Sequence, residues 1–305
     1  MIPYQFGGIA PANCRWAVPP ERVSDRVSGD WRKMKIRLMS HNVWGMFAPD
    51  VVREVANRAE LMRDIYLSER PDVLGTQEFS DAIRRAGLPE MIAPEYAVLD
   101  VAQDVAAYGM KTLFTPVFYR PATVMPVDAG FVLYDRAYNN QDSKGVTWGV
   151  FRTGSGERFT LLNTHYWWKS GEEHDRARVE NSRVILALAE KLPKPVFVMG
   201  DLNCRISSDA YRTLLSGGFA DAQACAAETA DSNTHHPYPD FDPVRRVFYG
   251  SPKPTGGYAS SIDHILVDAA HAGGMKAFTV LTSDAACNTS DHCPVMIGWE
   301  GHGAD

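Results

Sequence analysis

Side chains of catalytic types recur where the apolar runs of this sequence begin or end. They are Asn42 after residues 36–40, Glu78 after 73–76, His165 after 159–162, Asp201 and Asn203 after 196–199, Asp263 inside 261–267, and Asp291 and His292 before 293–297. Carboxylates, amides and imidazoles are groups that bind divalent cations and transfer protons. Each of them alone is ordinarily turn chemistry or a buried structural residue. The joint pattern indicates a site at the rigid edge of a sheet.

The elements that must position these residues follow from hydrophobic periodicity and from Gly and Pro signals. Predicted strands cover residues 36–43, 73–77, 111–119, 123–134, 145–152, 158–165, 196–199, 261–267, 276–281 and 294–299, and predicted helices cover 51–67, 174–192 and 209–215. Residues 221–257 are predicted to be mainly loop. Paired strands between helices favour two packed sheets with helices outside, in one domain over residues 34–305. Residues 1–33 are predicted to be an irregular arm, and Met34 is an alternative start.

The composition and net charge of the chain exclude several kinds of protein and make a dedicated DNA-binding module less favoured. The 305-residue chain is 45% hydrophobic and 22% charged, which excludes a disordered, collagen-like or coiled-coil protein. Its net charge of −6 lacks the basic surplus that is typical of a dedicated DNA-binding module.

The cysteines and the apolar runs indicate the cellular compartment in which the protein is expected to work. The five cysteines are Cys14, Cys204, Cys225, Cys287 and Cys293, and no C-x-x-C pair occurs among them. We therefore expect no disulfide framework and no Cys-rich zinc site, and free thiols favour the cytoplasm. No apolar run reaches the ~18 residues of a membrane span, and we expect no signal peptide.

Six segments together resemble one known family. They are Ser40-His41-Asn42-Val43-Trp44-Gly45, Thr76-Gln77-Glu78, Asn163-Thr164-His165, Gly200-Asp201-Leu202-Asn203, Ile262-Asp263-His264-Ile265-Leu266-Val267 and Ser290-Asp291-His292-Cys293-Pro294-Val295. In this order they resemble the endonuclease/exonuclease/phosphatase superfamily with its DNase-I-like fold, over residues 36–299. The resemblance implies an α/β (α+β) fold, a four-layered α-β-β-α sandwich of two mostly antiparallel sheets flanked by helices.

The resemblance also implies a metal-dependent phosphoric ester hydrolase. Such an enzyme neutralises phosphoryl charge, activates a water and stabilises the leaving group. Glu78 would be the main ligand of Mg²⁺, or of Mn²⁺ as an alternative ion. Asn42 would lie beside Glu78, and Asp291 would complete the metal region.

The same resemblance implies the remaining catalytic roles. Asp201 would orient or deprotonate the attacking water, and Asn203 would position the phosphate or that aspartate. His292 would contact a phosphate oxygen, with its tautomer fixed by Asp263. His165 would be a second imidazole beside the phosphate and a candidate general acid.

Two further groups of residues have competing interpretations. Trp167, Trp168 and Lys169 follow His165 and could bind a base or sugar ring and a second charge, or the indoles could pack in the core. His235 and His236 lie in a Pro-rich segment and are interpreted as surface residues, with a metal site as the less favoured alternative.

Three function classes remain. We favour a phosphoesterase acting on a small phosphorylated metabolite or nucleotide, because the charge is acidic. A nuclease of the same fold is the alternative, and its discriminator is a basic groove built from residues such as Arg84, Arg85, Lys169, Arg205, Arg245 and Arg246. Among phosphoesterases, a sphingomyelinase-like phospholipase is less favoured, because no secretory signal or membrane-inserting apolar hairpin is evident. A non-catalytic binding protein is the third class and is less favoured, since Glu78, Asp201, Asp263 and His292 are all present.

Overall fold

A computed structural model describes most of the chain. The described ranges are 33–45, 56–139, 142–237, 240–242, 244–245, 247–250 and 252–304. The predicted N-terminal arm, apart from Lys33, and the first residues of the predicted helix 51–67 lie outside these ranges, as does Arg246.

The first sheet has seven strands in the order β10-β14-β15-β1-β2-β4-β3. Their bounds are β1 (Met34–Asn42), β2 (Val73–Gln77), β3 (Ala97–Val98), β4 (Val117–Tyr119), β10 (Glu228–Thr229), β14 (Met275–Val280) and β15 (Val295–Gly301). Neighbours are antiparallel except β1–β2 and β10–β14, which are parallel. In β1, alternate residues are buried at the start and every residue is buried from Leu38 onward, so the strand becomes central where it approaches the predicted site.

The second sheet has six strands in the order β5-β6-β7-β8-β13-β9. Their bounds are β5 (Val124–Leu133), β6 (Gly145–Thr153), β7 (Arg158–His165), β8 (Val196–Asp201), β9 (Phe219–Asp221) and β13 (Asp263–Asp268). Only the β7–β8 pair in this sheet is parallel. A separate hairpin is formed by β11 (Asp240–Asp242) and β12 (Val247–Tyr249).

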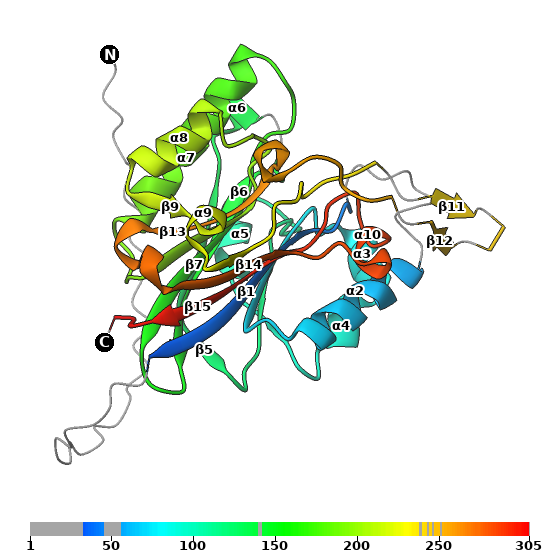
Figure 1. The fold of residues 1–305 in the computed structure, drawn as a ribbon, viewed down its shortest axis with the longest axis horizontal. Coiled ribbons are helices and arrows are strands. Elements are labelled where there is room, and N and C mark those ends of the chain that lie inside the picture. The colour runs from blue at the N-terminus through cyan, green and yellow to red at the C-terminus, as the bar shows by residue number, and fades with distance from the viewer. Residues whose placement is uncertain are drawn as a thin grey trace. The chain divides into compact units, whose positions relative to one another are not determined.

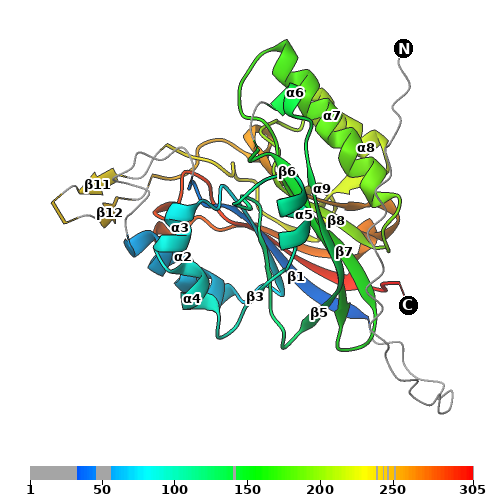
Figure 2. The ribbon, with the colours of Figure 1, turned by 180° about the vertical axis from the view of Figure 1, so that it is seen from behind.

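The described helices flank the two sheets. They are α2 (Ala56–Glu69), α3 (Asp81–Arg85), α4 (Leu88–Ile92), α5 (Ala102–Ala107), α6 (Arg136–Asn139), α7 (Glu172–Ala189), α8 (Asp209–Ser216), α9 (Ala222–Cys225) and α10 (Asp284–Cys287), with 3₁₀ turns at Tyr258–Ser260 and Ala269–Gly274. Figure 1 shows α7 and α8 on one side of the strands and α2 and α4 on the other, and Figure 2 shows the same order from behind. No helix within the described ranges combines the length and the apolar composition of a membrane-spanning helix.

Three apolar clusters separate the layers. One lies between the sheets and joins Leu38 and Val295 to Leu161 and Phe197. A second packs α2 and α4 on the first sheet, and a third packs α7 and α8 on the second. The predicted four-layered sandwich of two mostly antiparallel sheets is therefore confirmed, because apolar surface is buried on both faces of each sheet.

Two predicted elements differ from the observed ones. Residues 111–116 are not a strand, and β4 begins only at Val117. Pro116 has no N–H to donate to a neighbouring strand, and the carbonyl of Thr115 accepts a hydrogen bond from the Asn163 side chain. The predicted loop 221–257 contains α9, β10 and the β11–β12 hairpin.

Candidate active site

Strand register brings the predicted residues to one end of the sandwich. Parallel pairing of β1 and β2 sets Asn42 beside Gln77, so Glu78 follows directly. Parallel pairing of β7 and β8 sets His165 beside Asp201, and antiparallel pairing of β8 and β13 sets Asp263 on the other side of Asp201. Residues that lie far apart in the sequence thus meet because their strands end at the same edge.

Asp201 is the centre of the hydrogen-bond network and joins the two sheets. Asn42 Nδ2 donates to Asp201 Oδ2 at 3.0 Å and lies 3.5 Å from Glu78 Oε1. The backbone N–H of Asn203 donates to Asp201 Oδ1 at 2.8 Å, and Asn203 Nδ2 donates to Oδ2 at 3.2 Å. Burial opposes the charged form, but the hydrogen bond from His165 and the charge of His292 hold the pKa of Asp201 well below its usual range. Asp201 is therefore an oriented carboxylate at neutral pH.

Backbone conformation is unusual at the same place. Among the described residues, four non-glycine residues have a left-handed φ, and three of them lie in the predicted motifs: Trp44 at 49°, Glu78 at 58° and Asn203 at 47°. Such conformations cost about 1 kcal/mol or more each and persist where the surroundings over-determine them. Here they turn the chain sharply after β1, β2 and β8, which points the polar side chains into the site.

His292 and Asp263 form a buried pair. His292 Nδ1 lies 2.8 Å from Asp263 Oδ2, and Thr234 Oγ1 donates to the same oxygen at 2.7 Å. Although burial favours the neutral ring, the carboxylates of Asp263 and Asp291 raise the pKa of His292 well above its ordinary value. His292 is therefore an imidazolium at neutral pH, with Nδ1 committed to Asp263.

Asp291 lies on the other side of His292. Its Oδ1 is 4.0 Å from His292 Nε2, and its side chain is 19% exposed. Burial raises the pKa of Asp291 to about 6; His292 opposes this rise, and the carboxylate of Glu78 adds to it. The carboxylates of Glu78 and Asp291 therefore lie close enough for the charge of Glu78 to disfavour the charged form of Asp291.

His165 has a partner that the motifs do not include. Lys144 Nζ lies 2.7 Å from His165 Nε2 and 3.1 Å from Nδ1, and Nε2 also lies 3.4 Å from Asp201 Oδ2. Burial, and then the charge of Lys144, lower the pKa of His165. Burial lowers the pKa of Lys144 to about 8, although Glu78 and Asp201 oppose this shift. The pair therefore consists of a neutral His165 imidazole and a Lys144 ammonium group whose proton affinity is lower than that of an ordinary lysine.

The sequence indicates that Lys144 lies near His165, although Lys144 belongs to none of the six motifs. In the predicted hairpin, pairing of Arg152 with Arg158 fixes the register, and Val146 then pairs with Thr164. This register brings the residue before Gly145 next to His165. Lys144 is fully buried, and a buried lysine requires an explanation.

The three predicted substrate residues differ in burial. Trp167 is 2% exposed and Trp168 is 49% exposed. Core packing, one of the two interpretations weighed above, fits Trp167, whereas Trp168 presents its ring to solvent. Lys169 Nζ lies 5.7 and 5.9 Å from the centres of the two indoles, and Arg178 donates to the carbonyl of Lys169 at 2.8 Å. The helix α7 thus fixes the segment that follows His165.

The sequence was compared with models of known protein families. A sequence model of the Endonuclease/Exonuclease/phosphatase family matches residues 39–292. This chain belongs to that family. As a member of the Endonuclease/Exonuclease/phosphatase family it is a phosphoric ester hydrolase. The comparison with curated proteins gave no match.

Several solved structures share the fold. A Bacteroides vulgatus endonuclease/exonuclease/phosphatase has a TM-score of 0.70 at 21% identity, with 88% of this chain and 100% of that chain covered. The mannosyl-6-phosphatase Bt3783 of Bacteroides thetaiotaomicron has a TM-score of 0.66 at 22% identity, covering 86% and 98%. TDP2 of D. rerio complexed with single strand DNA product has a TM-score of 0.61 at 18% identity, covering 87% and 98%.

Proposed function

We propose that this protein is a Mg²⁺-dependent phosphoesterase that hydrolyses a small phosphorylated metabolite or a nucleotide. The observation that carries the proposal is the convergence of these side chains at one edge of the sandwich. Asn42 is hydrogen-bonded to Glu78 and Asp201, and ligand atoms of Asp201, Asp263 and His292 lie within 4.8 Å of one another. An oriented carboxylate, an imidazolium and a pair of hard oxygen donors are the groups that phosphate ester hydrolysis requires.

The donor chemistry fits magnesium, with manganese as an alternative. Glu78, Asn42 and Asp291 would hold the ion, because carboxylate and amide oxygens are its preferred ligands. The effect of the Glu78 charge on Asp291 supports this assignment, since a cation between the two carboxylates would offset their negative charge. When bound, the ion would neutralise charge on the phosphoryl oxygens.

Asp201 and Asn203 would position the attacking water. Because the pKa of Asp201 is held low, its carboxylate stays charged and accepts a hydrogen bond better than it removes a proton. We therefore assign Asp201 to orienting the water. Asn203 holds Asp201 through two hydrogen bonds and so keeps that carboxylate in one orientation.

His292 would contact a phosphate oxygen. Its Nδ1 is occupied by Asp263, which leaves the Nε2–H of the imidazolium to donate to the phosphate. A charge-assisted hydrogen bond of this kind strengthens as charge develops on the oxygen.

His165 would serve the leaving group together with Lys144. A neutral imidazole is a weak acid, so the role of His165 as a general acid requires a nearby proton source. Lys144 lies within hydrogen-bond distance and has a pKa of about 8. As His165 gives a proton to the leaving oxygen, Lys144 would replace it.

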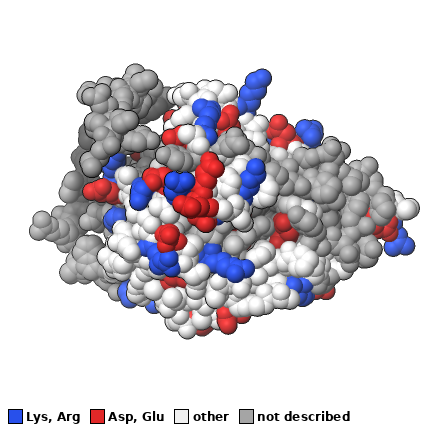
Figure 3. All heavy atoms as spheres, turned by 90° about the horizontal axis from the view of Figure 1, so that it is seen from above, with Lys and Arg blue, Asp and Glu red and all other residues white. Residues whose placement is uncertain are grey.

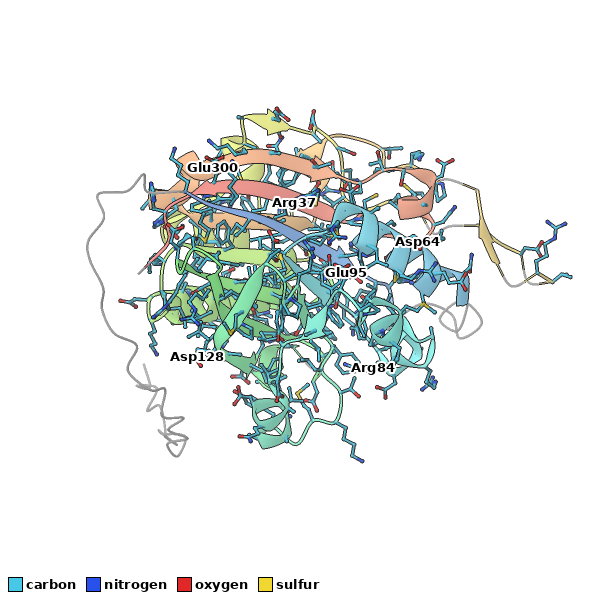
Figure 4. All side chains as sticks on the ribbon, turned by 90° about the horizontal axis from the view of Figure 1, so that it is seen from below. Arg37, Asp64, Arg84, Glu95, Asp128 and Glu300 are labelled. Atoms are coloured by element: carbon cyan, nitrogen blue, oxygen red, sulfur yellow. The ribbon has the colours of Figure 1, made fainter. Side chains whose placement is uncertain are left out.

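The surface supports a small substrate over a long polynucleotide. Of the six basic residues named for a nuclease groove, Arg84 (labelled in Figure 4) lies 3.9 Å from Asp81, and Arg245 lies 3.8 Å from Asp242. Their charges are therefore partly offset by neighbouring acids. On the described part of the face in Figure 3, acidic and basic side chains are mixed.

Two of the similar solved structures bear on the substrate class of this protein. One is named as a mannosyl-6-phosphatase, which supports a sugar phosphate here. The other is complexed with a single strand DNA product, which keeps a nuclease as the second candidate. The exposed ring of Trp168 beside Lys169 suits either a sugar or a base.

A hydrolysis screen in Mg²⁺ tests the proposal. The panel contains sugar phosphates, inositol phosphates, nucleotides, sphingomyelin, and single- and double-stranded DNA and RNA, and His292→Ala is the control enzyme. We expect turnover of one small phosphate ester and its loss in the control. Turnover confined to polynucleotides would instead establish the nuclease, and turnover that His292→Ala retains would exclude this site.

The same proposal extends to domain and location. We propose that residues 34–305 form a single catalytic domain that works in the cytoplasm. The described cysteines Cys204, Cys225, Cys287 and Cys293 are free thiols, which supports a reducing compartment.

A further inference from the structure

A second group of metal-ligating side chains lies behind the catalytic imidazole. It consists of His236 from the segment 233–237, Cys287 at the end of α10, and Cys293, which follows His292. The three side chains are 6%, 0% and 1% exposed, and their ligand atoms all lie within 4.8 Å of one another. None of the three belongs to the predicted magnesium site.

The spacing of the sulfur atoms fits a tetrahedral metal ion. Cys287 Sγ and Cys293 Sγ are 3.9 Å apart. Two thiolates at the zinc–sulfur distance of about 2.3 Å and at the tetrahedral angle would lie about 3.8 Å apart. Thiolate and imidazole ligands together favour zinc over magnesium, which prefers oxygen.

The tautomer of His236 supplies an independent observation. Its Nδ1 lies 2.7 Å from the carbonyl oxygen of Pro237, and since a carbonyl only accepts, Nδ1 carries the proton. Nε2 therefore presents its lone pair, and this atom is buried with no hydrogen-bond partner. A histidine whose Nδ1–H is held by a backbone carbonyl while Nε2 faces thiols is the usual arrangement of a zinc ligand.

We propose that His236, Cys287 and Cys293 bind one Zn²⁺ ion, with a water molecule as the fourth ligand. Binding releases the two thiol protons to solvent, so that each sulfur coordinates as a thiolate. The expectation from sequence, which opposed a Cys-rich zinc site, considered only closely spaced cysteines. Here the third ligand comes from a segment 51 residues before Cys287 in the numbering, and only the fold brings it near.

The location of this site gives it a structural role at the active site. The backbone N–H of His236 donates to the carbonyl of Asp291 at 2.9 Å, and that of Cys293 donates to the carbonyl of Thr234 at 2.7 Å. Thr234 in turn donates to Asp263, the partner of His292. The zinc ion would therefore fix the segment 233–237 against the segment 291–293, which includes His292.

Metal content of the purified protein tests the proposal without reference to activity. The protein is purified under reducing conditions without added metal, dialysed against Mg²⁺, and analysed for zinc. We expect one zinc per chain in the wild type and its loss in Cys287→Ser and in His236→Gln. Cys225→Ser is the matched control, because Cys225 lies outside the cluster, and it should retain the zinc.

Cobalt substitution and thiol counting cover the case in which a variant does not fold. Co²⁺ in the wild-type site should give the sulfur-to-metal absorption of tetrahedral thiolate coordination. Zinc should protect two thiols from alkylation until a chelator removes it.

Three outcomes would overturn the zinc site. They are a reduced wild-type protein without zinc, zinc that Cys287→Ser retains, and a mass lower by two hydrogens, which would indicate a Cys287–Cys293 disulfide. Each is independent of the phosphoesterase assay, so failure here leaves the proposed function unaffected.

Discussion

The charge state of Asp201 defines what this residue can do in the proposed reaction. Three hydrogen bonds from Asn42 and Asn203 fix both carboxylate oxygens, and the net effect of its neighbours keeps the group ionised. Orientation of a water by a fixed carboxylate depends on its charge and not on its shape. The isosteric amide is therefore the sharpest probe of this residue.

We expect Asp201→Asn and His292→Ala each to lower kcat by about 10²–10⁴-fold. Neither change should alter the far-UV circular dichroism spectrum, because the strands that carry these residues are held by the sheets. Steady-state kinetics on the substrate from the screen measures the effect. Wild-type rates in either variant would contradict the site assignment.

Lys144 is a residue at which the proposed function and the stability of the fold oppose each other. Its pKa is about 8 in the folded chain against an ordinary value of 10.5, so the unfolded state binds the proton more tightly. The unfolding free energy therefore rises with pH between about 8 and 10.5, and below pH 8 the full cost of the buried charge is present.

We expect Lys144→Met to be more stable than wild type at pH 7 and to lose that advantage by pH 10.5. Turnover should fall by about 10²-fold, because His165 loses its proton source. Urea unfolding of both proteins across this pH range measures the difference, with Lys276→Met as an exposed control. A difference that does not change with pH would exclude this account of Lys144.

At the scale of secondary structure, β7 connects the two sheets beside the candidate site through the side chain of Asn163. Asn163 of β7 accepts from Gln77 Nε2 at 2.6 Å and donates to the carbonyl of Thr76 in β2 on the other sheet. It also donates to the carbonyls of Thr115 and Pro116, which lie directly before β4. A Cβ at Gly75 would lie 2.5 Å from the Asn163 side-chain oxygen, so glycine permits this close approach. One buried amide thus sets the spacing between β2 and β7.

We expect Asn163→Leu to lower the free energy of unfolding by about 3 kcal/mol, because it leaves several buried polar groups without partners. Chemical denaturation measures the change. Gln103→Leu, an amide-to-leucine change on the exposed face of α5, is the control and should be close to neutral. If the two variants were equally stable, Asn163 would not be the link between the sheets.

Strand positions were predictable because apolar runs and turn residues are local signals. The prediction of β2 matches the observed bounds, and the predicted hairpin 145–165 has the observed pairing. The approach of Asn163 to β2 and the burial of His236 depend on contacts between segments far apart in the sequence. Local patterns do not specify such contacts, and for this reason the interpretation of His236 as a surface residue is wrong: His236 is 6% exposed.

At the scale of the whole molecule, the site exists only because both sheets contribute to it. Asn42 and Glu78 come from the first sheet, and His165, Asp201 and Asp263 come from the second. The site is therefore expected to form only when the sandwich is complete, and any part of the chain outside the sandwich is expected to be dispensable for catalysis. This expectation bears directly on the predicted arm.

We expect a chain that starts at Met34 to fold and to keep the kcat and KM of the full chain. Met34 is 2% exposed and pairs with Gly301, so β1 and its pairing with β15 are retained in full. The family match also begins later, at residue 39. Thermal unfolding and steady-state kinetics of the two chains provide the comparison. A shortened chain that folds but turns over substrate more slowly would show that the segment 1–33 acts at the site, whereas a chain that fails to fold would make that segment part of the sandwich itself.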